Sequence, residues 1–564
     1  MNIFKSILKI IGQITFVIIF FSTLEAKNLD KFNGAGSVSN YFSGILLLNN
    51  NKYDESFKFF KKLNGLEESH KNYSIKYIYS LVGSGNLDEA FNYSKKLEKK
   101  DLASFESYLV TGVFYLKNNN LNLAKKYFLK AKNRNSKSIL NNYISDSLFN
   151  LSNLKNIDIN NAILELKKLD KRFDNLKKIQ NVLLNCYYSS PITNKLFIDL
   201  NSNNNIDFSR YIYFHSSYIA SSGNIDKAKN IVQSGLELYP RNLLLNQYKI
   251  NLNEIKNIDA FNCKKENDIA AEIFYITANA LSSQSIYFLS NFYLNLAKFL
   301  NKDFHSFNIL LAENFYKLEN FENAKAIYKN LKKKGEAYKW FSTKQLARIF
   351  VKEEKKEEAI KITKNAYNDL NIKEVYETFD FAEFLKNSEK FEESIFYYTS
   401  VLKSIKNDHP LYAEATDGRG VAYERIGDWA KAEKDLLASL DADPNQAYVI
   451  NYLAYSWIEK GIKIEKSLSM LEKANKLRSN DPYIIDSLGW ALFKLERYKE
   501  SKDYLQMAVR LMPGDPIVND HYGDALWRNG NVIQARYYWN YVLKLEKTEN
   551  KLKNTIKEKL IKGL

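Results

Sequence analysis

Residues 486–501 read DSLGWALFKLERYKES, and the small residues Gly489 and Ser501 in this stretch mark a unit that recurs between Leu411 and Leu545. The first small residues of successive units are separated by 34, 35 and 34 positions. A period near 34 with paired small residues predicts a two-helix repeat stacked into a solenoid. The first small residue is Gly420, Ala454, Gly489 or Gly523, the second is Ala432, Ser467, Ser501 or Ala535, and a large residue follows at Leu436, Leu471, Leu505 or Trp539.

The period follows from the geometry of a helical hairpin. Two antiparallel helices of about 12 to 14 residues, each with a short turn, occupy roughly 34 residues. We expect small residues where the two helices approach most closely, and units that stack because one hairpin cannot bury its apolar face alone. The pairing also occurs earlier in the chain, at Gly44 with Ser56, Ile78 with Ala90, Gly112 with Ala124, Ser216 with Ala228, Ala312 with Ala324, Ala347 with Ala359 and Ala382 with Ser394.

The unit Gly420, Tyr423, Ala432, Leu436 and Pro444 resembles the tetratricopeptide repeat family, in which small, aromatic, Ala, large and Pro residues follow in this order. The resemblance implies an all-α fold, a right-handed α-solenoid of about 13 to 15 stacked helix-turn-helix hairpins. The expected organisation is regular units over 40–132, degenerate helical repeats over 133–300, units over 301–409, the clearest units over 410–545 and a capping helix over 546–564.

The sequence also predicts a boundary, two degenerate units and the role of the last segment. The lengthened turn around Pro410 is the candidate boundary between two halves of the solenoid. Two degenerate units are expected near Gln247 and Ala280. For residues 546–564 the alternative to a cap is a basic amphipathic helix on a membrane.

The first 26 residues differ from the rest of the chain. Lys5 and Lys9 precede a mostly apolar run from Ile10 to Leu24, which is short for a membrane span. This pattern predicts a secretory signal peptide over 1–26, with cleavage after Ala26, and a linker over 27–39. The alternatives are an uncleaved membrane anchor and a buried helix. The signal predicts the periplasm of a bacterium as the location.

The two cysteines, Cys186 and Cys263, lie 77 residues apart, which is a little over two repeats. Stacked hairpins advance about 10 Å each, given usual helix spacing. In a solenoid whose units contact only their neighbours, the two sulfurs would lie beyond disulfide reach. We therefore expect two buried free thiols.

The net charge of +17 raises the question of nucleic-acid binding. The clearest repeats, residues 411–540, hold 17 basic and 19 acidic residues, a net of −2, so the excess lies mainly in the amino-terminal part. Lysines dispersed over helix faces indicate a solvated surface, and no nucleic-acid partner is expected. The alternative is attraction of the basic amino-terminal half to an anionic membrane or cell-wall polymer.

The chain shows no pattern typical of a catalytic or metal site. It has no phosphate-binding glycine loop and no metalloprotease or cysteine-based metal motif. Because repeats fill nearly all the length after the signal, no block of about 150 residues remains for a catalytic domain. The sequence predicts a protein that is not an enzyme, with no metal and no cofactor. The five histidines fall in different units, at His70, His215, His305, His409 and His521.

In the resembled family, the first helix of each hairpin lines a concave groove that contacts the ligand. The matching positions here are rich in aromatic residues, which often anchor binding surfaces, and in carboxylates, which favour peptides carrying Lys or Arg. The alternative is that some of the aromatic side chains belong to the core between repeats. The candidate partner-binding residues are Tyr448, Asn451, Tyr455, Tyr483, Asp486, Trp490, Asp520, Asp524, Trp527 and Arg528, with Glu414 and Asp417 on the preceding unit.

The segments NYLAYSW, DSLGWALFKLERYKES and HYGDALWRNGN are similar to those of exported bacterial tetratricopeptide proteins. Among these are outer-membrane adaptors that deliver substrates to a carboxyl-terminal processing protease. The resemblance implies a non-catalytic periplasmic scaffold that binds protein or peptide, such as an envelope protease and its substrates. Membrane association would follow if the signal segment stays uncleaved. The alternative hypothesis is a cell-envelope structural factor that binds glycan or anionic membrane through its basic amino-terminal half.

Overall fold

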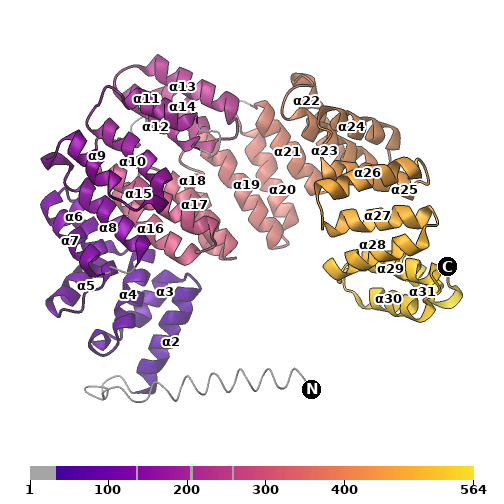
Figure 1. Cartoon of the computed structure of the whole chain (residues 1–564), viewed down its shortest axis with the longest axis horizontal. Coiled ribbons are helices and arrows are strands. Elements are labelled where there is room, and N and C mark those ends of the chain that lie inside the picture. Colours follow the sequence, from indigo (N-terminus) through magenta and orange to yellow (C-terminus); the bar gives the residue numbers. More distant parts are fainter. Residues whose placement is uncertain (1–33, 135–137, 203–207, 257–259, 372) are drawn as a thin grey trace. The chain divides into compact units, whose positions relative to one another are not determined.

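The fold is described from a computed structural model of the 564-residue chain, which describes residues 34–134, 138–202, 208–256, 260–371 and 373–564 (Figure 1). The described residues form the α-helices α2 to α31 and three short 3-10 helices, and they contain no strand. The predicted all-α solenoid of helical hairpins is confirmed. The predicted signal peptide, 1–26, lies outside the described residues, and the predicted linker is described only from residue 34. Within the described residues, no helix is long and apolar enough to span a membrane.

The chain divides into two compact units, Met1–Ala359 and Ile360–Leu564. The candidate boundary predicted from the sequence is at Pro410. This residue lies inside the second unit, in the turn that precedes α23 (Tyr412–Arg425). The division falls within α20 (Lys356–Asn368), where the repeat pattern continues without a break. The boundary between the two compact units therefore does not require a longer turn, because it is determined by which hairpins pack against one another.

Unit 2 is a regular stack of hairpins in which each first helix packs on its own second helix and on the next hairpin. Two of its first helices begin at an Asp-Pro pair. Asp481 and Asp515 accept hydrogen bonds from the two backbone N–H groups that follow each proline, as expected of N-cap residues. Its helices are α21 (Val375–Asn387), α22 (Phe391–Ser404), α23, α24 (Trp429–Ala442), α25 (Ala447–Glu459), α26 (Ile464–Leu477), α27 (Pro482–Lys494), α28 (Tyr498–Leu511), α29 (Pro516–Arg528), α30 (Val532–Lys544) and α31 (Asn550–Lys562).

Unit 1 begins with consecutive hairpins from α2 to α13 and then departs from the regular pattern. Its helices are α2 (Ala35–Asn49), α3 (Tyr53–Lys61), α4 (Lys71–Gly83), α5 (Leu87–Lys99), α6 (Phe105–Lys117), α7 (Leu121–Arg134), α8 (Ile139–Leu151), α9 (Ile159–Lys167), α10 (Asp174–Tyr187), α11 (Thr193–Asn201), α12 (Arg210–Ser221), α13 (Ile225–Leu238), α14 (Leu243–Glu254), α15 (Glu266–Ser283), α16 (Tyr287–Leu300), α17 (Ser306–Lys317), α18 (Phe321–Leu331) and α19 (Glu336–Lys352).

The small residues mark the closest approach of the two helices in each hairpin. A Cβ atom on Gly112 would overlap the ring of Phe128, and one on Gly489 would overlap Leu505. The large residue four positions after the second small residue therefore packs directly over the first one. In the degenerate region, the pair close to the expected position near Ala280 is Ala278 with Ser290, whose hydroxyl donates to the Ala278 carbonyl at 2.7 Å.

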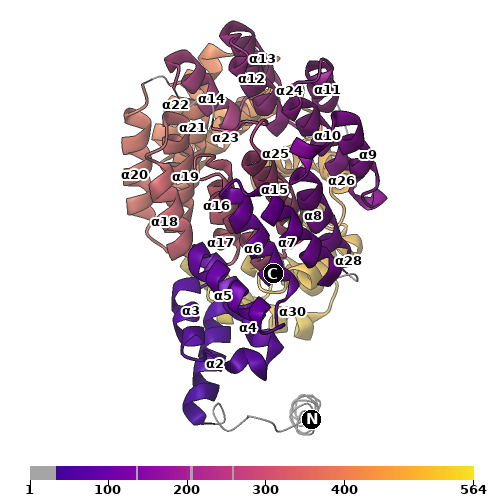
Figure 2. The same ribbon diagram turned by 90° about the vertical axis from the view of Figure 1, so that its left-hand side faces the viewer.

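The hairpin of α15 and α16 overturns the expectation that each repeat contacts only its neighbours. In unit 1, α15 packs on α6, α8 and α10, and α16 packs on α4 and α6. Both views show this hairpin beside the first helices of the early repeats (Figure 1, Figure 2). Most side chains of both helices are buried. A helix that is apolar on most of its surface is buried on all sides, which explains why it lies inside the unit.

Polar contacts hold α15 against α12. The Arg210 guanidinium donates to both carboxylate oxygens of Glu272, at 2.9 and 2.7 Å, and Tyr211 Oη donates to the same carboxylate at 3.0 Å. The guanidinium also lies 3.7 Å from the centre of the Tyr275 ring. A buried carboxylate and guanidinium tolerate loss of solvent only when each is fully paired, so these contacts fix where α15 lies.

Cys186 and Cys263 form a disulfide, and the prediction of two free thiols is wrong. Their Cα atoms are 5.9 Å apart, although 77 residues separate them. The prediction assumed that sequence distance translates into distance along the stack. The segment that precedes α15 instead returns to the end of α10, because the interior hairpin packs against the early repeats.

Two further hydrogen bonds join the first hairpin of unit 1 to the hairpin of α17 and α18. Asn320 and Asn323, at the turn between α17 and α18, donate to the carbonyls of Asn50 and Asn51, each at 3.3 Å. Residues 270 positions apart therefore meet within one unit.

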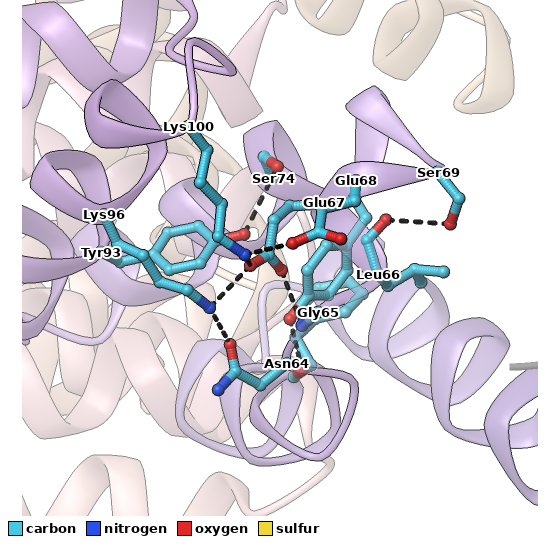
Figure 3. Close-up of polar contacts among 12 residues, drawn as sticks. Asn64, Gly65, Leu66, Glu67, Glu68, Ser69, Ser74, Tyr93, Lys96 and Lys100 are labelled. Carbon is cyan, nitrogen blue, oxygen red and sulfur yellow. Dashed lines mark hydrogen bonds and ion pairs between the residues drawn. The ribbon is translucent and has the colours of Figure 1, made fainter. Parts of the chain in front are cut away.

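A buried carboxylate anchors the turn between α3 and α4 (Figure 3). The Glu67 side chain is fully buried, and it accepts hydrogen bonds from Gly65 N at 2.8 Å and lies 2.6 Å from Lys96 Nζ. Although burial opposes ionisation, the bond from Lys96 lowers the pKa of Glu67. These contacts connect the turn before α4 to the end of α5, so the cluster joins the first two hairpins.

Substitution of Gly523 by alanine tests the packing rule. The new Cβ would lie 2.5 Å from the indole nitrogen of Trp539, whose Nε1 donates to Asp524. Overpacking of this kind costs about 1 to 3 kcal/mol, so we expect lower stability in guanidinium unfolding followed by tryptophan fluorescence. The matched control is Gly514→Ala, since no atom lies within 4 Å of a Cβ there. Equal stability of the two variants would contradict the rule.

Candidate functional site

The candidate site is the surface of unit 2 that α23, α25, α27 and α29 present, which we call the first-helix face. These are the helices that carry the residues predicted from the sequence to contact a partner. The first helices lie next to one another, with α25 against α27 and α27 against α29. Side chains one repeat apart therefore meet on this face.

The α25 helix presents Tyr448, Asn451 and Tyr455, which its helical period places on one side. Tyr448 is 51% exposed, and its hydroxyl donates to Asp481 at 2.9 Å and accepts from Arg478 at 3.0 Å. The Asn451 amide oxygen accepts no hydrogen bond within the described residues, although solvent does not reach it. An unsatisfied acceptor that is closed to solvent costs free energy, so Asn451 is a local exception among the polar groups of this face.

Four of the predicted residues are buried instead of exposed: Asp486, Trp490, Asp520 and Asp524. Trp490 lies face to face with the His521 imidazole, with the ring centres 3.9 Å apart, and its Nε1 donates to Glu459 at 2.8 Å. His521 Nδ1 lies 3.0 Å from Asp486. One tryptophan thus connects α25, α27 and α29, so it acts in the core between repeats, which was the alternative weighed for the aromatic side chains.

The charge on His521 is set by its surroundings. Burial alone would lower its pKa, but the Asp486 carboxylate, with Asp520 and Asp524, raises the pKa above the ordinary value of 6.5. The charged imidazolium therefore persists toward neutral pH. It stabilises the contact between α27 and α29.

The carboxyl-terminal helix α31 reaches the same face. Lys559 Nζ lies 2.6 Å from Asp520 and 2.7 Å from Asp524. Ile556 is fully buried in the last core cluster, with Leu552 and Leu560 packed against it. The ammonium group of the chain's own last helix thus occupies the acidic end of the first-helix face.

The opposite end of this face carries carboxylates with fewer partners. Burial raises the pKa of Asp417 to about 6, and Glu383 and Glu414 act in the same direction. Asp417 forms no ion pair within the described residues, whereas Glu383 pairs with Lys386 at 2.7 Å. This end therefore acquires negative charge as the pH rises through 6.

The structure separates the predicted site residues into two groups. Tyr448, Tyr483 and Arg528 are exposed, Asn451, Tyr455 and Trp527 are half-buried, and the remaining four are internal. The residues that sequence reasoning missed are Glu459, His521 and Lys559. Of these, His521 could have been assigned from the sequence, because it follows Asp486 by 35 residues, which is one repeat, and one repeat brings side chains together on adjacent first helices.

The protein is a helical-repeat protein, as its stacked hairpins and paired small residues show. The described residues contain no separate globular domain. Two profiles of the tetratricopeptide repeat match the sequence, over residues 297–548 and 105–138. These segments are therefore tetratricopeptide repeats, as the small-residue spacing predicted.

A curated relative and two solved structures are similar to parts of the chain. TPR repeat-containing protein PA4667 of Pseudomonas aeruginosa is 30% identical over 126 residues, which is 22% of this chain and 20% of that protein. MamA from Desulfovibrio magneticus RS-1 is 20% identical over 31% of this chain and 97% of its own, with a TM-score of 0.28. YrrB, titled a TPR protein with an unusual peptide-binding site, is 17% identical over 35% of this chain and 97% of its own, also at 0.28. At these TM-scores the two structures add no argument about function.

The raised pKa of His521 predicts a pH dependence of stability. Its contribution is fully present below pH 6.5, the unfolded value, and is lost as the pH rises through the folded pKa. We expect a loss on the order of 1 kcal/mol between pH 6 and 9, measured by urea unfolding at fixed ionic strength. His521→Gln should remove most of this slope, and His409→Gln, which changes a histidine in the same unit, should leave it unchanged. A slope that survives in His521→Gln would assign the effect to another group.

Proposed function

We propose that this protein is a non-catalytic scaffold whose first-helix face in unit 2 binds a lysine- or arginine-bearing segment of a partner protein. The observation that carries the proposal is the position of Lys559, whose ammonium group lies between two carboxylates of this face. Because Lys559 already pairs with these buried carboxylates, a partner's ammonium would bind in the same manner at the other end of the face, beside Asp417 and Glu414.

The remaining features of this face fit an extended peptide. Tyr448 and Tyr483, 51% and 56% exposed, offer flat contact area on neighbouring repeats. Asp417 and Glu414 supply negative charge one repeat earlier.

Unit 1 is a poorer candidate for the same role. Its corresponding face, formed by α4, α6, α8 and α10, is covered by α15 and α16. A peptide would have to displace a buried hairpin that a disulfide and a buried ion pair hold in place. We therefore place peptide binding on unit 2.

Peptide binding can be tested with a labelled peptide of alternating Lys and Ala residues, and with a Glu and Ala counterpart, by fluorescence anisotropy on the full chain. We expect the lysine peptide to bind at least tenfold more tightly than its acidic counterpart. The double variant Tyr448→Ala with Tyr483→Ala should weaken binding about tenfold, because it removes two exposed anchors and no core contact. Affinity should rise from pH 5 to pH 7 as Asp417 ionises.

The matched control is Tyr537→Ala, which removes an exposed tyrosine from the second helix α30 of the same unit. Equal weakening by this control would contradict the proposal. So would salt-labile retention on cell wall or anionic vesicles without any peptide binding, which would favour the alternative function of the basic amino-terminal half.

We further propose that the protein is exported to the periplasm, where its partner is an envelope protein such as a processing protease with its substrates. The apolar run before residue 26 and the disulfide support export, since structural disulfides persist in oxidising compartments. In protein isolated from its native cells without reductant, we expect an amino terminus at Lys27 and a linked peptide pair containing Cys186 and Cys263. Full-length protein with two free thiols in the cytosol would exclude export.

A further inference from the structure

A cavity of about 540 Å³ lies in unit 1 beside α14. Elsewhere in the early part of unit 1 each first helix is followed by a second helix, but α14 is followed by the segment that carries Cys263 and then by the interior helix α15. The helix that packs on α14 instead is α19, which comes much later in the chain. The cavity therefore sits where the repeat is interrupted.

The inner wall of the cavity is aromatic and rigid. Tyr213, Tyr248, Phe304 and Tyr338 line it, and all four are buried. The rings of Tyr213 and Tyr248 pack edge to face with centres 4.6 Å apart. A wall of interlocked rings keeps the cavity open without a ligand, since none of these rings can move into it without losing its own contacts.

The rim of the cavity is basic. Lys333, Lys334 and His305 line it, and none of the three forms an ion pair or a hydrogen bond through its side chain within the described residues. Burial lowers the pKa of His305, and the charge on Lys334 lowers it further. The one acidic residue among the lining side chains is Asp303, which is solvent-exposed.

The two lysines are held at the rim by a fixed turn. The backbone N–H of Ala337 donates to the Gln247 side-chain oxygen at 3.2 Å, which joins the start of α19 to α14. A Cβ atom on Gly335 would overlap the same Gln247 amide, so only glycine allows this approach. The Gln247 amide in turn donates to Asn251 Oδ1 at 2.9 Å. The turn that carries the two lysines is therefore fixed relative to α14, whose Gln247 and Asn251 also line the cavity.

We propose that this cavity is a binding site for a small organic anion, whose phosphate or carboxylate group is held by Lys333, Lys334 and His305. Lys333 and Lys334, which form no ion pair within the described residues, can attract an anion, and the imidazole of His305 can donate a hydrogen bond to it. The cavity volume lies in the range of small-molecule sites. The aromatic wall excludes water from one side of the anion, which strengthens its attraction to the lysines. This site is independent of the peptide surface on unit 2.

Isothermal titration of the full chain with pyrophosphate and with citrate tests the site, and each probe is compared with sodium chloride at equal ionic strength. We expect saturable binding of at least one probe. Pyrophosphate alone would indicate a phosphate ligand, and citrate alone would indicate a carboxylate. Lys333→Glu with Lys334→Glu should weaken binding at least tenfold, whereas Lys333→Arg with Lys334→Arg should retain it. Circular dichroism and the melting temperature verify that the variants fold.

The control is Lys329→Glu, which makes one such lysine-to-glutamate change on α18 at an exposed residue that does not line the cavity. It is compared with the single variants Lys333→Glu and Lys334→Glu as well as with the double variant. This control should change the affinity less than twofold. Equal weakening by the control, or no saturable binding of either probe at 10 mM (roughly the upper limit of a useful site), would overturn the proposal. Binding of the lysine peptide to unit 2 should be the same in all these variants.

Discussion

The close approach of two helices over a small residue is the contact on which the rest of this structure depends. Gly112 under Phe128 and Gly523 under Trp539 show the same arrangement at distant points of the chain. Each approach leaves one apolar side of the hairpin uncovered, and only another hairpin can cover it. The stack, its length and its exposed first-helix face all follow from that requirement.

The two units satisfy the requirement differently, and this difference separates their roles. In unit 1 the hairpin of α15 and α16 covers the first helices, and the chain returns to its own beginning near Asn50. In unit 2 the first-helix face is covered at its end by α31, where Lys559 meets Asp520 and Asp524. Where α14 lacks a second helix, the stack leaves a cavity with a basic rim. The peptide binding that we propose for one unit and the anion binding that we propose for the other would both follow from where the repeat is uncovered or interrupted.

The candidate site could be predicted only in part from the sequence. The repeat spacing correctly placed Tyr448 and Tyr483 on an exposed surface, because helical position alone determines which way they point. It could not reveal that Trp490 is enclosed, since its partners Glu459 and His521 come from the preceding and the following first helices. Whether a side chain is buried depends on the residues that surround it in three dimensions. The spacing of residues along a helix indicates only the direction in which the side chain points.

The sequence by itself determined the all-α hairpin repeat, its period and the small residues at each closest approach, because these depend on backbone geometry within about 34 residues. Only the tertiary structure decided that Cys186 meets Cys263, that α15 and α16 lie inside unit 1 and that Lys559 reaches the first-helix face. These contacts depend on small rotations between successive hairpins that accumulate along the stack. The sequence of one repeat does not specify this accumulated rotation. The spacing of residues along the chain therefore could not predict which distant residues come into contact.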